Sequence, residues 1–155
     1  MAPLDQRRGE EKWLEMAQEE HASVASFAVF SLQLLACGAP MELIEEAHLA
    51  ALDEIRHARI ALKLAGGDSA PASLKKPLKL TIKPNIKSMA LETARDACIG
   101  ETVSVIEMER IPALRSVIQD EKRHASLGWR TVRWALEQEP ALEWDLKQLF
   151  HASAP

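Results

Sequence analysis

Apolar residues recur at steps of three and four along most of this chain, and that is the period of an α-helix. The first such stripe runs from about Glu11 to Ala36, and the second runs from about Pro40 to Ala65. Three more follow over about 85–110, 112–138 and 140–151. The pattern therefore predicts an all-α protein.

Glycine and proline separate the predicted helices. Gly38 and Pro40 stand between the first two stripes, as expected because Gly suits a helix C-terminus and Pro suits the first turn of the next helix. Residues 66–84 contain Pro and many Lys residues and have the length of a crossover along the side of a bundle. Within them, Leu78 to Ile82 alternates and is also compatible with a short extended piece.

The order of these elements predicts the architecture. Two antiparallel helix pairs, joined by the long crossover, would form a four-helix bundle, and the segment 140–151 would add a short C-terminal helix. The length of 155 residues fits one domain, 1–155, that can bury a sizeable core.

Composition excludes several classes of protein. The formal net charge of -4 offers no basic surface for nucleic acid. No apolar run approaches the roughly 18 residues that a membrane span needs, and the N-terminus lacks a hydrophobic signal segment. Cys37 and Cys98 form no CxxC motif and are expected to be reduced thiols. We therefore expect a cytoplasmic protein.

An internal repeat is the strongest signal in the sequence. Residues 53–58 read DEIRHA and residues 120–125 read DEKRHA. Upstream of the two copies, Glu20 and Glu101 are each followed by Ser-Val at the third and fourth positions. The chain thus has two helix pairs, each with a Glu on its first helix and an E-x-x-H motif on its second.

The distances of these glutamates from the predicted turns can be compared. With a turn near Ile111, both glutamates of the second pair lie 10 residues from it. With a turn near Gly38, Glu20 lies 18 residues before and Glu54 lies 16 after. At about 1.5 Å per residue this mismatch is roughly 3 Å, within the reach of a Glu side chain. Each pair should therefore bring its two carboxylates to one level.

The glutamates and histidines of the repeat lie inside the apolar stripes. Carboxylates that converge in a core repel one another and lose their hydration, so cations must neutralise them. Two divalent ions would balance four carboxylates, and two neutral imidazoles would complete the ligand set. In E-x-x-H the two side chains lie one turn apart on the same side of a helix. The candidate metal ligands are Glu20, Glu54, His57, Glu101, Glu121 and His124.

This pattern resembles that of the ferritin-like superfamily, in which two helices supply one Glu each and two others supply E-x-x-H. The resemblance covers nearly the whole chain. The doubled D-E-x-R-H is similar to the version in oxygen-activating members, including the ribonucleotide reductase small subunit and bacterial multicomponent monooxygenases. It implies a ferritin-like four-helix bundle with two iron ions, or manganese ions, at its centre.

The resemblance also implies a role for each residue. The carboxylates that would bridge the two metals are Glu54 and Glu121. Glu20 and Glu101 would be terminal ligands, and His57 and His124 would each bind one metal. Asp53 and Asp120 would accept hydrogen bonds from the imidazole N–H groups, and Arg56 and Arg123 would support these aspartates.

The second helix pair departs from the family pattern. Glu20 and Glu54 are 34 positions apart, whereas Glu101 and Glu121 are only 20 apart. The second pair is therefore shorter at its turn end, which argues against a standard ferritin cage.

Three functions remain open on this sequence. The first is an oxidoreductase that reacts with O2 or peroxide through the six ligands, either ferroxidase-like or oxidising a small substrate with an external electron donor. The second is an iron-binding or storage protein without an organic substrate. The third is a structural helical bundle, in which buried ion pairs such as Glu54 with Arg123 take the place of metal. A homodimer is compatible with each.

Several other residues have ordinary explanations. Gly100 can permit close packing or a π-bulge beside the predicted ligand that follows it, and Gly128 is best explained by helix packing. Cys98 is expected to be a buried structural thiol. His21 and His48 are expected at the surface, and the four tryptophans are expected to be core or helix-docking groups.

Overall fold

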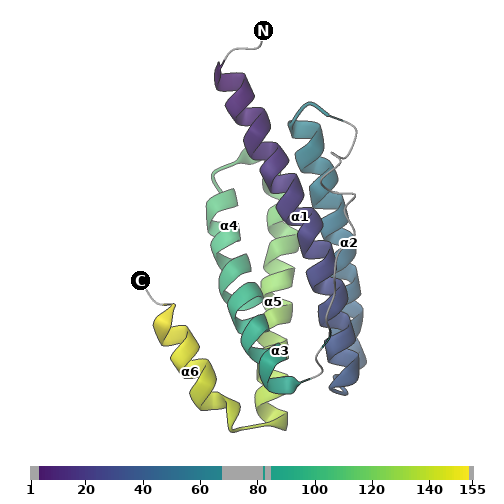
Figure 1. Cartoon of the computed structure of the whole chain (residues 1–155), viewed down its shortest axis with the longest axis vertical. Coiled ribbons are helices and arrows are strands. Elements are labelled where there is room, and N and C mark those ends of the chain that lie inside the picture. The colour runs from purple at the N-terminus through teal and green to yellow at the C-terminus, as the bar shows by residue number, and fades with distance from the viewer. Residues whose placement is uncertain (1–3, 68–81, 83–84, 154–155) are drawn as a thin grey trace. The chain divides into compact units, whose positions relative to one another are not determined.

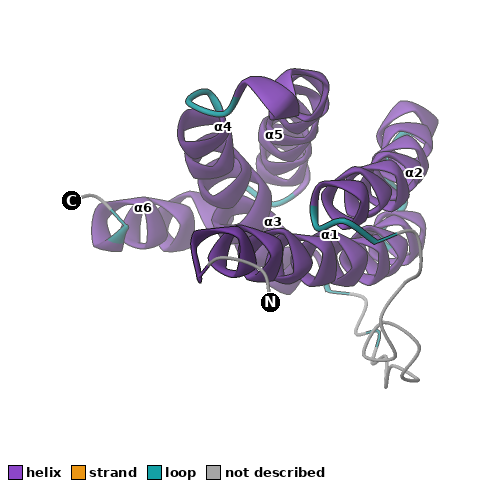
Figure 2. Ribbon diagram, turned by 90° about the horizontal axis from the view of Figure 1, so that it is seen from above, coloured by secondary structure: helices purple, strands orange, loops and turns teal. Residues whose placement is uncertain are grey.

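The structure, a computed structural model, describes residues 4–67, 82 and 85–153. Every regular element in these ranges is a helix, so the all-α prediction is confirmed there (Figures 1 and 2). Most of the predicted crossover, including the possible extended piece before Ile82, lies outside the described residues. No helix in the described ranges is both long and apolar enough to cross a membrane.

Most helix boundaries lie near the predicted ones. The helices that match the predicted stripes are α1 (Leu4–Ala36), α2 (Met41–Leu64), α5 (Arg115–Gln138) and α6 (Leu142–Ala152). The main difference is the start of α1, which was expected near Glu11. The preceding segment, LDQRRGE, has no Pro and consists mostly of residues that tolerate a helix, so it extends α1 without an apolar stripe.

The predicted third helix has an internal change of geometry. It begins as α3 (Ile86–Thr93), continues as a π-helix, η2 (Ala94–Glu101), and ends as α4 (Thr102–Met108). The side chain of Asn85 caps α3 by accepting a hydrogen bond from the Ser88 N–H at 3.0 Å. After the turn, a short 3-10 segment, η3 (Pro112–Leu114), leads into α5.

Two glycines end α1 and α2 in the same way. Gly38 has φ 72° and Gly66 has φ 78°, a region that favours glycine because it has no Cβ. The Ala39 N–H donates to the Leu34 carbonyl at 2.9 Å, and the Gly67 N–H donates to the Leu62 carbonyl at 3.1 Å. These bonds satisfy the last carbonyls of each helix, as in a Schellman motif.

The chain divides into two compact units. The first unit contains residues 1–29 and 48–81, and the second contains residues 30–47 and 82–155. The prediction of a single domain is left open by this division.

In the first unit, α1 and α2 run antiparallel. Ala17 on α1 shares a buried cluster with Ala61 and Leu62 on α2. Three residues further along α1, Glu20 lies beside His57, four residues earlier on α2. Residue numbers therefore rise along α1 where they fall along α2, as in an antiparallel pair. The small alanines let the two helices approach closely.

In the second unit, α3, η2 and α4 follow one another beside α5, and α6 packs against them (Figure 1). The buried apolar residues that join these helices are Ala90, Ala94, Cys98, Val132, Ala135, Leu142 and Leu146. At the edge of this core, Lys87 forms an ion pair with Asp145 at 2.7 Å and links the start of α3 to α6.

Two polar contacts attach the tip of the α1–α2 hairpin to the rest of the second unit. Gln33 donates to Glu92 on α3 at 3.3 Å. Arg130 on α5 makes a two-pronged contact with Glu46 on α2, with one nitrogen–oxygen distance of 2.8 Å. This hydrogen bond raises the pKa of Arg130 above its usual value.

The tryptophans differ in their surroundings. Trp129 stacks on Phe150 with ring centroids 5.4 Å apart and so docks α6 against α5. Trp144, by contrast, is 68% exposed, so the expectation that it is a core or docking group is wrong. It lies two positions after buried Leu142, and two residues along a helix turn the side chain to nearly the opposite face.

Gly128 is needed where α5 approaches the π-helix. A Cβ atom at Gly128 would lie 2.6 Å from the Ala97 Cβ and 3.3 Å from the Cys98 nitrogen. A Cβ atom at Gly100 would meet only the Arg95 carbonyl oxygen, at an ordinary 3.6 Å. Helix packing therefore explains Gly128 as predicted, whereas no close contact requires Gly100.

This contrast gives a matched pair of variants. Gly128→Ala should lower the free energy of unfolding by about 1–3 kcal/mol, because the added methyl overpacks a rigid contact. Gly100→Ala should leave stability unchanged or raise it by up to about 1 kcal/mol through helix propensity. Urea denaturation followed by circular dichroism measures both. Equal stability of the two variants would contradict the close approach at Gly128.

Candidate metal centre

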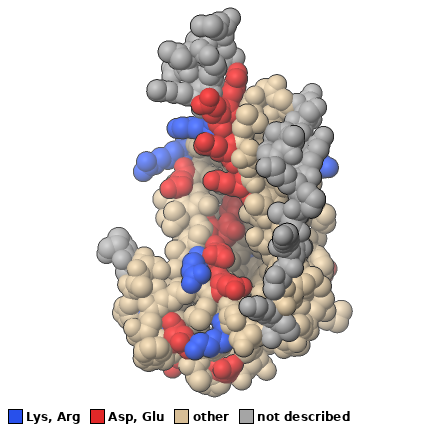
Figure 3. Space-filling model, viewed as in Figure 1, with Lys and Arg blue, Asp and Glu red and all other residues tan. Residues whose placement is uncertain are grey.

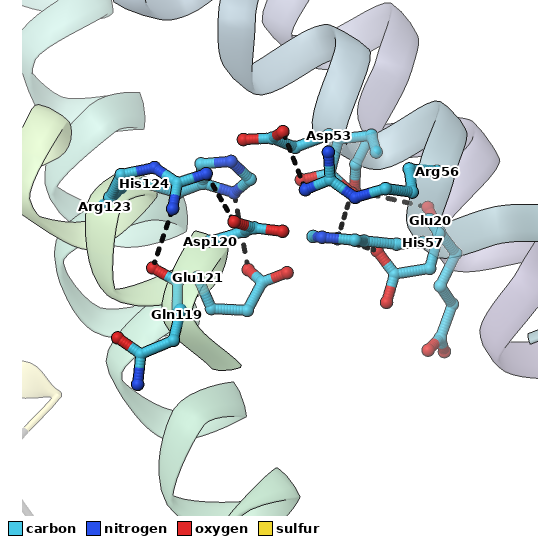
Figure 4. Close-up of polar contacts among 12 residues, drawn as sticks. Glu20, Asp53, Arg56, His57, Gln119, Asp120, Glu121, Arg123 and His124 are labelled. Atoms are coloured by element: carbon cyan, nitrogen blue, oxygen red, sulfur yellow. Dashed lines mark hydrogen bonds and ion pairs between the residues drawn. The ribbon is translucent and has the colours of Figure 1, made fainter. Parts of the chain in front are cut away.

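The first unit contains a buried group of two carboxylates and one imidazole. Glu20 comes from α1, and Glu54 and His57 come from α2. Figure 4 shows Glu20 and His57 side by side. The His57 Nδ1 atom lies 3.5 Å from a Glu20 carboxylate oxygen and 3.8 Å from a Glu54 carboxylate oxygen. The structure thus brings these three predicted ligands together.

Helix geometry explains why Glu54 and His57 share this position. They are three residues apart on α2, and side chains at that spacing lie on one face of a helix. The same face carries the buried alanines Ala50, Ala58 and Ala61. Short side chains on either side leave space for the longer polar groups.

Other acidic residues of α1 differ from Glu20 because they are exposed to solvent. Acidic side chains gather around the N-terminal part of this helix (Figure 3), and Glu11, Glu15 and Glu19 are all exposed. Water solvates such carboxylates, so they need no counter-ion. Glu20, next to Glu19, is buried and is the one that faces His57.

The second unit repeats the arrangement. Glu101 ends η2, and Glu121 and His124 lie three residues apart on α5. The His124 Nδ1 atom lies 3.5 Å from a Glu121 carboxylate oxygen, and both side chains are buried. Glu101 is half-buried, and its carboxylate belongs with theirs to a group whose ligand atoms lie within 4.8 Å of one another.

The π-helix determines how Glu101 is presented. A π-helix has more residues per turn than an α-helix, so it rotates the residues that follow out of the α-helical register. At its end, the Thr102 hydroxyl donates to the Cys98 carbonyl at 2.7 Å and satisfies an oxygen where the hydrogen-bond register changes. A π-bulge was one of the two explanations for Gly100, but no sequence signal marks Thr102, because a lone Thr on a helix forms no pattern.

Each E-x-x-H motif is preceded by an aspartate that pairs with an arginine. Arg56 donates to Asp53 at 2.9 Å, and Arg123 forms the same contact with Asp120 (Figure 4). The charges within each pair offset one another, so the arginines support the aspartates that flank the ligands. The contact of these aspartates with the imidazoles stays a prediction, as does the alternative Glu54–Arg123 ion pair.

The distances between each histidine and its neighbouring carboxylates fit a shared metal ion. Bonds from a divalent metal to carboxylate oxygen or imidazole nitrogen are about 2.0–2.2 Å, so two ligands of one ion are at most about 4.4 Å apart. The distances of 3.5 and 3.8 Å around His57 and of 3.5 Å around His124 lie within that limit. Two carboxylates per unit carry the charge that one divalent cation neutralises. The buried Glu and His groups can therefore hold metal.

Cys98 lies one turn before Glu101 but is an unsuitable ligand. It packs in the apolar core of the second unit, and burial raises the pKa of its thiol to about 12. At neutral pH it is therefore a thiol, and its Sγ atom belongs to neither of the groups of candidate ligand atoms. Both cysteines are free, and Cys98 is the buried structural thiol that was expected.

No protein-family model, curated protein or solved structure matches this chain. The ferritin-like interpretation therefore depends on the ligand pattern and on the geometry within each unit.

The burial of Cys98 can be tested by alkylation. In the folded protein, iodoacetamide should modify the half-buried Cys37 well before Cys98 between about pH 7 and 9, because Cys98 forms almost no thiolate below its raised pKa of about 12. Unfolding in urea should make the two rates similar. Peptide mass spectrometry measures both sites. Fast native labelling of Cys98 would contradict its position in the core.

Proposed function

We propose that this protein holds two divalent iron ions, and that each of its two units contributes two glutamates and one histidine as ligands. One observation carries the proposal: the same buried arrangement of Glu and E-x-x-H occurs in both units, on different helices. A chance cluster of acidic residues would not repeat its histidine, its flanking aspartate and its Asp–Arg pair. In the proposed assembly the four long helices close into a ferritin-like bundle.

The charge balance supports metal over a purely structural role. Within each unit the Asp–Arg pair offsets its own charges, while the two glutamates face a single imidazole. Carboxylates that gather in a protein interior repel one another and lose their hydration, which is costly. A divalent cation in each group would offset this repulsion, and a neutral imidazole is the form that binds metal.

The donor set narrows the choice of metal. Carboxylate oxygens suit hard cations such as Mn²⁺ and Mg²⁺, whereas imidazole suits Fe, Zn and Cu. Iron and manganese both accept such a mixed set of donors, and we propose iron because the ligand pattern resembles that of the di-iron carboxylate bundles. Iron bound by these residues would supply redox chemistry toward O2 or peroxide.

We propose that the protein is an oxidoreductase that either acts as a ferroxidase or oxidises a small substrate. Glu54 and Glu121, the most deeply placed glutamates, would bridge the two ions, and Glu20 and Glu101 would be terminal ligands. The half-buried Glu101 is the ligand closest to solvent, so small reactants would enter on its side. Metal binding or iron storage without an organic substrate is the second candidate.

Metal loading tests the ligand assignment with neighbouring residues as controls. Anaerobic titration with Fe(II) should reach two ions per chain in the wild type and in Glu19→Gln, and fall well below two in Glu20→Gln. His57→Ala should lose binding, whereas His48→Ala, at an exposed position of the same helix, should keep it. Elemental analysis after desalting gives the stoichiometry.

Admission of oxygen to the same samples tests the reaction. Loaded wild type should develop a near-ultraviolet charge-transfer band that the Glu20→Gln and His57→Ala variants lack. Repeated oxidation of excess Fe(II) indicates a ferroxidase, and one stoichiometric oxidation indicates a binding protein. If both variants load and oxidise iron like the wild type, the proposed ligands are wrong.

Stability without metal separates the metal site from a structural bundle. In the presence of a chelator, the free energy of unfolding of Glu54→Gln and of Glu121→Gln should equal or exceed that of wild type, because a neutral amide removes a buried charge. With metal at about 100 times its dissociation constant, wild type should gain about 2.7 kcal/mol for each bound ion and the variants much less.

The alternative gives the opposite result. If Glu54 belongs to a buried ion pair, its removal should cost about 3–5 kcal/mol with or without metal. Urea denaturation with and without Mn²⁺, which avoids oxidation during the measurement, distinguishes the two.

A further inference from the structure

A second face of α2 carries a regular pattern that the metal centre does not use. α2 is one uninterrupted helix from Met41 to Leu64. Six of its exposed residues follow alternating steps of three and four, the a/d spacing of a coiled coil, which places them along one side of a helix. They are Glu42, Glu45, Leu49, Leu52, Arg56 and Arg59.

The centre of this face is apolar and its two ends carry opposite charges. Leu49 is 52% exposed and Leu52 is 61% exposed, so two large apolar side chains stand in water. The two glutamates lie toward the N-terminus of the helix, and the two arginines lie toward its C-terminus. Glu54 and His57 point the other way, into the first unit.

The order of these residues makes the face complementary to itself. We propose that a second copy of this chain docks here, with the two α2 helices antiparallel about a two-fold axis between Leu49 and Leu52. In that arrangement the numbers of two facing residues add up to 101, so Leu49 faces Leu52 of the partner subunit. By the same rule, Glu45 faces Arg56 of the partner subunit and Glu42 faces Arg59 of the partner subunit.

Charge complementarity selects this occupant. Each layer occurs twice in a symmetric dimer, which gives two leucine layers flanked on both sides by two layers of opposite charge. A parallel pair in the same register would place Glu against Glu and Arg against Arg, which is unfavourable. A different protein would have to reproduce the same acidic–apolar–basic order in reverse, which a second copy already provides.

The existing contacts of Arg56 are compatible with this role. One of its terminal nitrogens donates to Asp53 at 2.9 Å, while 51% of its side chain stays exposed. A guanidinium group carries five N–H donors in a plane, so it can bind a second carboxylate without releasing the first. The same residue would then connect the dimer face to the helix turn that holds Glu54.

The composition of the face indicates a moderate affinity. Exposed ion pairs are individually weak and are screened by salt, and only two leucines per copy lose contact with water. The dimer should therefore be reversible, should form as protein concentration rises, and should weaken at high ionic strength. It is independent of metal, so it can be tested on the metal-free protein.

Charge reversal provides the test, measured by sedimentation equilibrium over a concentration series. Glu42→Arg alone and Arg59→Glu alone should each raise the dimer dissociation constant by about tenfold, because two attractive pairs become repulsive. An equimolar mixture of these two variants should recover the wild-type constant or better, since one then carries positive charge at both positions and the other negative charge. Leu52→Gln, which changes no charge, should also weaken the dimer.

Matched control variants change the net charge of the protein by the same amount as the test variants. Glu107→Arg on α4 and Arg133→Glu on α5 change exposed residues on other helices by equal amounts and should dimerise like wild type. Circular dichroism confirms that each variant is folded. A wild type that stays monomeric to its solubility limit overturns the proposal. So does a dimer that both reversals leave intact, or a mixture that associates no better than its components.

Discussion

Burying a carboxylate is the constraint on which the organisation of this protein depends. Each unit has an aspartate and at least one glutamate among its buried residues, and hydration no longer stabilises their charge there. Asp53 and Asp120 are each matched by an arginine three residues later, on the same helix. The glutamates instead gather around a histidine. That difference separates residues that complete a local ion pair from residues that can bind a cation.

The scaffold positions these groups with small residues and one change of helix geometry. Alanines line the inner face of α2, and Gly128 lets α5 approach the π-helix closely enough that a methyl group would not fit. The π-helix changes the direction in which Glu101, its last residue, is presented, and the Thr102 hydroxyl donates a hydrogen bond to the Cys98 carbonyl. Close helix packing and the placement of the ligand are therefore parts of one local arrangement in the second unit.

α2 has two faces with different tasks. Its inner face presents Glu54 and His57, and its outer face carries the acidic, apolar and basic positions that match a second copy of the chain. Arg56 lies between them, because it bonds Asp53 while remaining half-exposed. A partner docked on the outer face would therefore contact the same helix that supplies two of the proposed ligands, on the side away from them.

The sequence by itself determined the helices and the pairing of the candidate ligands. Gly38 and Gly66 end helices because only glycine readily adopts a positive φ, and E-x-x-H places its two side chains together through helix periodicity alone. These are local effects, so they can be read along the chain. Only the tertiary structure decided the extent of the π-helix, the exposure of Trp144 and the need for Gly128. The need for Gly128, for example, depends on how closely α5 approaches the π-helix, and residues distant in sequence set that distance.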